Sequence, residues 1–292
     1  MEIISTIFIL GFYTCFCTGT VPVTDDELKT FSEALFSKDN STNGKSYVDV
    51  KVQGRTNSGS QRDQAPLPLL SIDNEIKKVP TVAKLIALYD NYDPDTSHSE
   101  VVTTSEKKEE SDFLDAVLNT SVLAFTNTFL RSKGYTNGTK AEMKDLLYKI
   151  WFTIYSRGQK KLGSSAFEHV FMGEIKREEV SGFHNWIYFG HEEDNKHVNY
   201  LGYMKILQFQ GNGGIMKIHY TWNGKSKPVG TLFVGTSPEL ELSLYTVCFL
   251  IRPNDKCYLR LGGKDIFIQT YTFTLHKEKL IGSAFPGIVQ DY

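Results

Sequence analysis

The spacing of apolar residues changes near Gly163, and this change limits the fold more than any other feature of the 292-residue chain. Before that glycine, apolar residues recur at helical spacing in residues 24–36, 73–91, 108–132 and 140–156. After it, short runs rich in β-branched and aromatic residues, from HVFMGEI to IFIQTYTF, alternate with turns of Gly, Asn and Pro. The sequence therefore predicts an α+β fold, helical in its first half and antiparallel β in its second.

The first 19 residues are typical of a secretory signal peptide. Residues 3–17 (IISTIFILGFYTCFC) form an apolar run shorter than the ~20 residues of a membrane span, and polar TDDE follows soon after. We expect cleavage between Cys17 and Val21 and a secreted mature protein that is not held in a membrane. A signal anchor or a buried first helix is the alternative, because no Lys or Arg precedes the apolar run.

Three glycosylation sequons agree with a secretory route, and they begin at Asn40, Asn119 and Asn137. Asn137 lies in the turn sequence GYTNGTK and is the best candidate. Asn119 lies inside an apolar helical pattern, which makes it the weakest of the three.

Two of the four cysteines would leave with the signal peptide. The remaining pair, Cys248 and Cys257, flanks a Pro-Asn-Asp turn in CFLIRPNDKCYL, a pattern that predicts two neighbouring strands. An oxidising compartment favours a disulfide across these strands, with two reduced core thiols as the alternative. The spacing does not suit a four-ligand zinc site.

Composition divides the chain into four stretches. Residues 1–19 are the signal peptide, 20–68 an N-terminal helix and a flexible linker rich in Ser, Asn and Gly, 69–160 a helical subdomain and 161–292 a β-rich catalytic region. The 32 basic and 34 acidic side chains give a formal net charge of −2. This balance argues against a broadly basic nucleic-acid coat but leaves room for a local basic cleft.

Two histidines lie in a conspicuous local frame, His169 in FEHVFMGE and His184 in GFHNWIYF. The charged segment IKREE between them predicts a hairpin that brings both together, each at the start of a strand. Imidazoles, with a pKa near 6.5, are natural proton donors and acceptors at neutral pH. From these residues alone, acid–base catalysis, metal binding and structural hydrogen bonding all remain open.

Two long segments, SSAFEHVFMGEIKREEVSGFHNWIYF and WNGKSKPVGTLFVGTSPELELSLYTVCFLIRP, resemble the EndoU family of poly(U)-specific endoribonucleases. The likeness is densest over residues 165–290, and residues 69–292 together would form the EndoU-like domain. This resemblance implies an endoribonuclease that cleaves single-stranded RNA, with a preference for uridylates. Attack by the ribose 2′-OH would leave a 2′,3′-cyclic phosphate and a 5′-OH.

The resemblance also implies roles for particular residues. His169 and His184 would be the two catalytic histidines, and Lys227, in the pattern W-x-G-x-x-K, would be the catalytic lysine. We expect His184 to act as the general base and His169 as the general acid. The lysine ammonium would stabilise the charge that grows on the phosphorane oxygens.

Uridine recognition depends on three further positions. Thr231 holds the place of a Ser or Thr that contacts uracil in similar proteins. Near the C-terminus the T-x-Y pattern of the family reads Ser283-Ala284-Phe285 in this chain. Phe285 can stack on a base but has no hydroxyl, so the hydrogen-bonded part of uridine selection stays open.

The resemblance further implies Mn²⁺ as a cofactor, with Ca²⁺ as an alternative. Glu168 and Glu174 are the candidate ligands, since Mn²⁺ suits carboxylates. We expect a monomer that acts on U-containing single-stranded RNA and has no membrane partner.

Two other classes of function remain open from the sequence. The Phe285 departure suggests an RNA-binding or signalling module with little or no cleavage. A hydrolase of another substrate is the third class, although no GxSxG frame of a serine hydrolase occurs.

Overall fold

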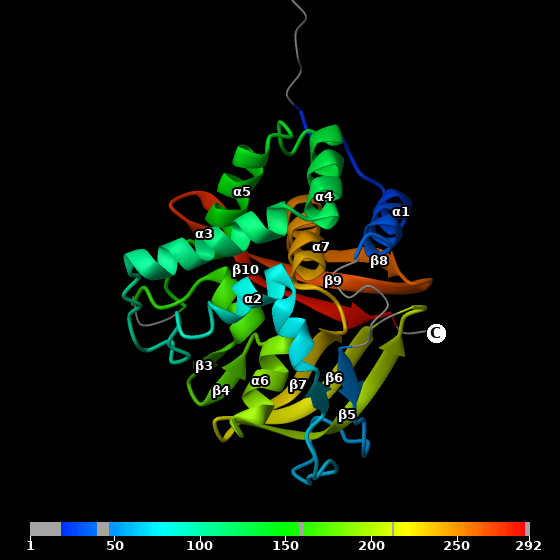
Figure 1. Cartoon of the computed structure of the whole chain (residues 1–292), viewed down its shortest axis with the longest axis vertical. Coiled ribbons are helices and arrows are strands. Elements are labelled where there is room, and N and C mark those ends of the chain that lie inside the picture. The colour runs from blue at the N-terminus through cyan, green and yellow to red at the C-terminus, as the bar shows by residue number, and fades with distance from the viewer. Residues whose placement is uncertain (1–18, 40–46, 158–160, 212, 290–292) are drawn as a thin grey trace, which may run out of the picture.

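The structure is a computed structural model that describes residues 19–39, 47–157, 161–211 and 213–289. Helices pack on one side of a central three-stranded sheet, and a second three-stranded sheet lies on its other side (Figure 1). The predicted α+β fold is confirmed. The predicted signal peptide and the Asn40 sequon lie outside the described residues.

The first half of the chain is helical, as predicted, but two of the four predicted helices are broken. Its elements are α1 (Asp25–Phe36), η1 (Asn74–Lys78), α2 (Pro80–Ile86), α3 (Thr104–Leu118), α4 (Ser121–Ser132) and α5 (Lys140–Phe152). Pro80 has no N–H to continue η1 and instead occupies the first turn of α2. The Thr120 side chain accepts a hydrogen bond from Leu123 N and starts α4 anew. The spacing of apolar residues alone does not show where one helix ends and the next begins.

Two antiparallel sheets dominate the second half. One contains β5 (Val198–Gln208), β6 (Gly214–Trp222) and β7 (Lys225–Val234), and the other contains β8 (Lys256–Leu261), β9 (Lys264–Leu275) and β10 (Glu278–Ile288). The strand order of the second sheet is β10-β9-β8. β10 packs against β6 and β7, so the two sheets meet along this strand.

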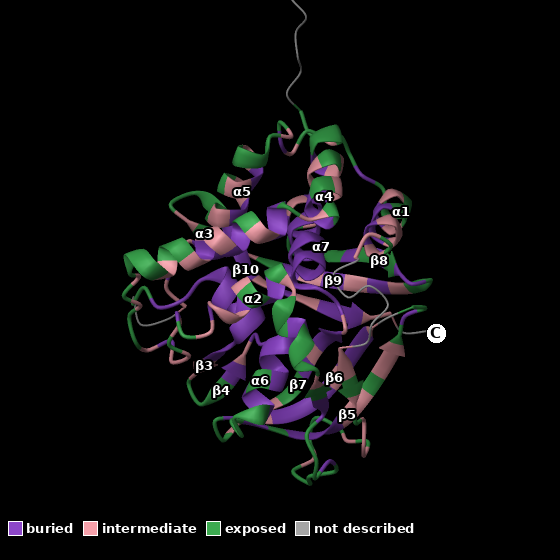
Figure 2. Ribbon diagram, viewed as in Figure 1, coloured by how far each residue is buried: buried purple, intermediate pink, exposed green. Residues whose placement is uncertain are grey.

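Three segments that the sequence predicts as strands are helical. HVFMGEI contains the π-helical turn η2 (Glu168–Met172), HNWIYFG forms α6 (Trp186–Asp194) and YTVCFLI lies within α7 (Pro238–Ile251). A short continuous apolar run is equally compatible with a buried strand and a buried helix. α7 is buried on nearly all sides between helices and sheet, which explains why it has no polar stripe (Figure 2).

The predicted disulfide between Cys248 and Cys257 is present, with the two Cα atoms 5.5 Å apart. The predicted pair of strands around it is wrong, because Cys248 lies in α7 and Cys257 in β8. The bond therefore ties the central helix to the outer strand of the sheet beneath it.

The N-terminal helix α1 packs on β8. The hydroxyl of Ser32 donates to the carbonyl oxygen of Arg260 and accepts from the N–H of Arg260, both at 2.9 Å. Lys29 forms an ion pair with Asp265 at 2.8 Å. α1 is thus joined to the β half of the chain.

The segment that follows α1 is not the free linker that its composition suggests. β1 (Val48–Val50) pairs with β2 (Leu70–Ile72), and the Gln64 N–H donates to Leu201 O in β5 at 3.1 Å. The Glu193 carboxylate accepts from the N–H groups of Leu69 and Leu70. Small polar residues serve here because they allow the turns between these short pairings.

Asn119 and Asn137 are both exposed, Asn119 at the break between α3 and α4. Within the described ranges no single helix is long and apolar enough to cross a membrane, and only the pair α3 and α4, bent by 82°, meets the length and composition criteria together.

Candidate active site

The two histidine segments are joined through the hairpin β3 (Glu174–Lys176) and β4 (Glu179–Ser181). Two backbone hydrogen bonds connect them beyond the hairpin, from Phe183 N–H to His169 O at 2.9 Å and from His184 N–H to Val170 O at 2.7 Å. The hairpin that brings His169 and His184 together is confirmed. The prediction that each histidine starts a strand is wrong, because His169 lies in η2 and His184 precedes α6.

Gly182 allows this close approach. A Cβ atom at this position would collide with the carbonyl oxygen of His169, and the glycine φ of +68° is one that other residues rarely adopt. The next residue, Phe183, also has a φ of 68° although it carries a side chain. Such backbone strain is typical of sites where geometry matters for function.

His169 is buried, and both of its ring nitrogens have partners. Nδ1 lies 2.8 Å from the Glu174 carboxylate and Nε2 lies 3.0 Å from the Ser283 hydroxyl. Burial, reinforced by the positive charge of Arg157, lowers the pKa of His169 to about 4, although Glu174 acts in the opposite direction. Because a carboxylate only accepts, Nδ1 carries a proton and the Nε2 lone pair of the neutral ring is left for proton transfer.

His184 is also buried and is held by the backbone of β7. Its Nδ1–H donates to Thr231 O at 2.6 Å, which again leaves the Nε2 lone pair available. Burial and the nearby Lys227 ammonium lower the pKa of His184 well below its usual value. The imidazole is therefore neutral at pH 7 and suited to accept a proton.

Lys227 supplies a positive charge to the same place. Its Nζ donates to Val180 O at 3.2 Å, and burial lowers its pKa to about 8, so most of the ammonium is still charged at pH 7. The neighbouring Lys225 instead pairs with Glu178 at the surface. The choice of Lys227 over Lys225 from the motif agrees with this geometry.

A cleft of about 680 Å³ lies between the two sheets, and its lining includes all six side chains that the sequence predicts for catalysis and substrate binding: His169, His184, Lys227, Thr231, Ser283 and Phe285. Its described lining contains four lysines and no carboxylate. The cleft is therefore a local site of positive charge in a chain whose net charge is −2.

The three predicted substrate-binding residues also position the histidines. The Thr231 carbonyl fixes His184, the Ser283 hydroxyl contacts His169, and the Phe285 ring stacks on the His184 ring with 5.3 Å between centroids. Thr231 also lines the cleft. Two residues of β10 therefore contact the two histidines: Ser283 contacts His169, and Phe285 contacts His184.

Glu168 and Glu174 do not fit the role of manganese ligands. Both oxygens of Glu174 are already engaged, one by His169 and the other by Arg157 and Ser164. Burial raises the pKa of Glu168 well above its usual range, and a protonated carboxyl is a poor cation ligand. Among the residues that the structure describes, no group of three or more His, Cys, Asp and Glu side chains could hold a metal.

Glu174 is a positioning residue for His169. Burial opposes ionisation of its carboxyl, but His169, Arg157 and Ser164 together hold its pKa below the usual value. Arg157 donates from Nε to Glu174 at 2.6 Å and from Nη2 to the Tyr155 hydroxyl. Arg157 could not be recognised from the sequence, because an isolated arginine after a predicted helix carries no local signal of a partner 17 residues away.

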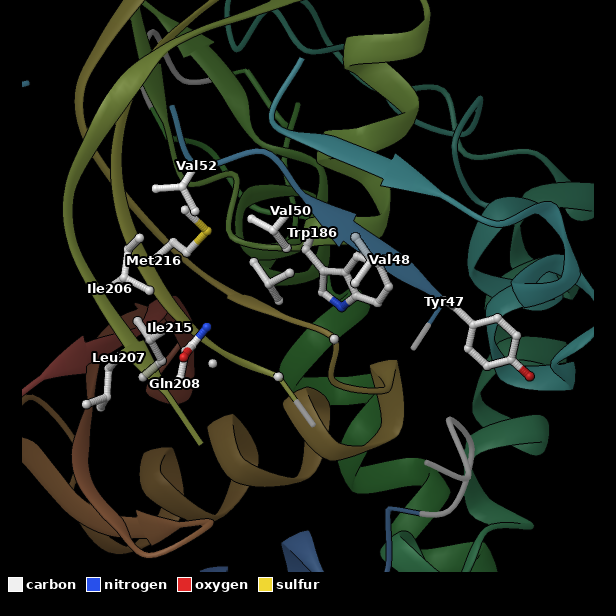
Figure 3. Close-up of a pocket in the computed structure, with 14 residues that line it drawn as sticks. Tyr47, Val48, Val50, Val52, Trp186, Ile206, Leu207, Gln208, Ile215 and Met216 are labelled. Atoms are coloured by element: carbon white, nitrogen blue, oxygen red, sulfur yellow. The ribbon is translucent and has the colours of Figure 1, made fainter. Parts of the chain in front are cut away.

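A second cavity, of about 220 Å³, lies between β1, the start of α6 and the β5-β6-β7 sheet (Figure 3). Its lining is largely apolar, with Val48 and Val50 from β1 near Trp186, and Met216 from the sheet. Its described lining contains no carboxylate, imidazole or amine. Proton-transfer chemistry therefore belongs to the cleft and not to this cavity.

Comparison with known proteins identifies relatives over most of the chain. The chain is 36% identical over 280 residues to a uridylate-specific endoribonuclease of Drosophila melanogaster, covering 94% of this chain and 87% of that protein. It is 36% identical to a mouse uridylate-specific endoribonuclease over 90% of this chain, but spans only 65% of the mouse protein. A solved structure of XendoU, described as a splicing-independent snoRNA-processing endoribonuclease, matches with a TM-score of 0.75 and 32% identity, over 90% of this chain and 97% of XendoU.

The family model for endoribonuclease XendoU matches residues 27–286. Most of α1 and all of β1 therefore fall inside the matched region, and the domain begins about 40 residues before the boundary expected at residue 69. With the family match, the relatives and the shared fold in agreement, the chain belongs to the endoribonuclease XendoU family.

Proposed function

We propose that this protein is a secreted endoribonuclease that cleaves single-stranded RNA at uridylates by attack of the ribose 2′-OH. One observation carries the proposal: two buried imidazoles, each with Nδ1 held by an acceptor, line the same cleft as a half-buried lysine. The names of the fly and mouse relatives, both uridylate-specific endoribonucleases, support the choice of substrate.

The reaction needs a base, an acid and a positive charge. His184 Nε2 removes the proton of the 2′-OH, and O2′ then forms a bond to phosphorus. The bond from phosphorus to O5′ breaks, and His169, which becomes an imidazolium when the phosphodiester binds, gives its Nε2 proton to that oxygen. The products are a 2′,3′-cyclic phosphate and a 5′-OH. The Lys227 ammonium stabilises the charge on the non-bridging oxygens in between.

The partners of the two histidines favour this assignment of roles. His169 is backed by the Glu174 carboxylate, and an anion at Nδ1 stabilises the imidazolium that a general acid requires. His184 is backed by a neutral carbonyl oxygen, which favours the neutral ring of a base. A bound phosphodiester adds negative charge beside both rings and raises the pKa of each from its lowered value in the free protein.

The test uses short fluorogenic RNAs that contain one U, C, A or G, with His184→Ala and Lys227→Ala as matched variants. We expect cleavage at U that leaves a cyclic phosphate and falls by at least about 100-fold in each variant. RNA binding without cleavage in the wild type would instead favour the binding module. Parallel assays with Mn²⁺, Ca²⁺ and EDTA test the manganese expectation, for which the structure supplies no ligand set at Glu168 and Glu174.

Uridine selection is the part of the proposal that Phe285 bears on most directly. The Phe285→Tyr substitution restores a hydroxyl while keeping a ring that stacks on His184. We expect the ratio of kcat/KM for U over C to rise by about 3- to 10-fold, the worth of one hydrogen bond. Paired U and C substrates measure this ratio, and an unchanged ratio would separate this position from base choice.

Secretion is the remaining part of the proposal. The apolar N-terminal run, the sequons and the disulfide between Cys248 and Cys257 support it together. Expression in a secretory host should release protein whose N-terminus lies between residues 17 and 21 and whose Asn137 carries glycan. Intact mass and peptide mapping give both results, and a retained apolar N-terminus would favour the signal anchor.

A further inference from the structure

The cleft contains four lysines, which is more positive charge than one phosphodiester requires. Lys205, Lys217 and Lys256 line it in addition to Lys227. Among the described residues no carboxylate forms an ion pair with any of these three, whereas Lys29, Lys133 and other surface lysines do have acidic partners. Unpaired lysines gathered in one cleft indicate an anionic ligand larger than the scissile phosphate.

Strand register places Lys205 and Lys217 in one row with Thr231. Lys217 on β6 is directly opposite Thr231 on β7, and Lys205 on β5 is directly opposite Lys217. Residues directly opposite each other share a face, and like charges in this position destabilise a sheet. With strands about 4.8 Å apart, the row extends about 10 Å from Thr231, whose carbonyl holds His184.

The opposite wall of the cleft carries aromatic side chains on β8 and β9. Tyr258 and Phe267 are register partners, and the Phe267 ring lies where a side chain of Gly287 would otherwise be. Lys256 Nζ lies 4.9 Å above the Phe267 ring, which holds this cation at the cleft. Tyr258 is 37% exposed, so part of its ring is open to a ligand.

We propose that Lys205, Lys217 and Tyr258 form a subsite for the next nucleotide beyond the two that the cleaved phosphodiester joins. The two lysines bind the phosphate of that nucleotide, and Tyr258 stacks on its base. A row of cations facing an aromatic wall is how single-stranded nucleic acid is bound without reading its sequence. The inference rests on the proposed function, because it extends the same cleft along the same substrate.

The test compares a dinucleotide, UpA, with two hexanucleotides that carry one U and are extended on its 5′ or its 3′ side. UpA has one phosphate and no group to occupy the subsite. For the double variant Lys205→Ala/Lys217→Ala we expect KM to rise about 10-fold for at least one hexanucleotide, with kcat unchanged, and KM for UpA to stay within about 2-fold of the wild type. Tyr258→Ala should affect the same hexanucleotide.

Salt dependence gives a readout that a purely structural role of the lysines would not change. Each lost phosphate contact lowers the slope of log affinity against log salt by about 0.7 for a single strand. The two lysines share one phosphate, so the double variant should lose about 0.7 from the slope for the affected hexanucleotide. Lys279→Ala, an exposed strand lysine outside the cleft, is the matched control and should change neither slope nor KM.

The outcomes for the two proposals are distinct. Equal effects of the double variant on UpA and both hexanucleotides, or no effect on any of them, would overturn the subsite while leaving the proposed function intact. A wild-type protein that cleaves no substrate would instead overturn the proposed function. The melting temperature of each variant confirms that the compared proteins are folded.

Discussion

At the scale of single residues, each proposed catalytic side chain is held by a group that is distant in the sequence. Ser283 contacts His169 from 114 residues away, and the carbonyls that hold His184 and Lys227 are each 47 residues away. Burial then sets their protonation, because it disfavours the charged form of each group. The properties of the site belong to the folded environment and not to the residue types alone.

Lys227 gives the clearest pH dependence. Its pKa is lowered to about 8, and RNA phosphate binds its charged form, so affinity should fall as the pH rises through about 8. Lys227→Arg keeps its charge throughout this range. For a non-cleavable RNA with 2′-deoxyuridine, we expect the Kd of the wild type to rise by up to about 5-fold between pH 8 and pH 9, and that of the variant to stay flat.

The control for this prediction is the same titration at pH 6 to 7, where wild type and Lys227→Arg should each bind with a constant Kd. A parallel loss of affinity in both proteins above pH 8 would assign the titration to another group.

At the scale of elements, the turn from β4 into α6 sets the distance between the histidines. Gly182→Ala combines an unfavourable φ with a collision at His169 O. The matched control is Gly224→Ala, where φ is +74° and nothing lies within 4 Å of the added Cβ. We expect Gly224→Ala to cost about 1 kcal/mol and Gly182→Ala about 1–3 kcal/mol more.

Urea unfolding measures both free energies, and single-turnover cleavage shows whether Gly182→Ala also slows the chemical step. Equal losses of stability in the two variants would mean that the contact with His169 O does not constrain the turn.

Some helices and strands could be predicted from the sequence, and others could not. The helices of the first half were predictable because one face of each is polar, and the hairpin was predictable from the charged turn between two apolar runs. The second half of α7 was not, since burial on nearly every side removes the polar stripe that indicates helical spacing. The histidines and Lys227 were recognisable from motifs, whereas Arg157 and Lys205 become meaningful only through tertiary contacts and strand register.

At the scale of the whole molecule, the N-terminal part of the chain packs onto the β-rich C-terminal half. α1 packs on β8, and residues 47–72 pair with one another and with β5, so the N-terminal part contacts both sheets that form the cleft. The family match from residue 27 agrees with this integration. The N-terminal segment is therefore part of the folded domain and not an appendage to it.

The bond between Ser32 and the backbone of Arg260 has a consequence for solubility. β8 is an outer strand of its sheet, and outer strands present unpaired N–H and C=O groups that recruit other chains. One serine hydroxyl satisfies both backbone groups of Arg260. α1 thereby covers the outer edge of β8, which could otherwise pair with a strand of another molecule.

Removal of residues 19–39 should therefore increase self-association as the protein concentration rises, as measured by light scattering against the full mature protein. Ser32→Ala, which keeps the helix but leaves both groups of Arg260 unpaired, should show the same trend more weakly. A truncated protein that stays monodisperse would contradict this role. If the trend holds, proteolysis between α1 and β1 would remove the protein from solution without touching a single catalytic residue.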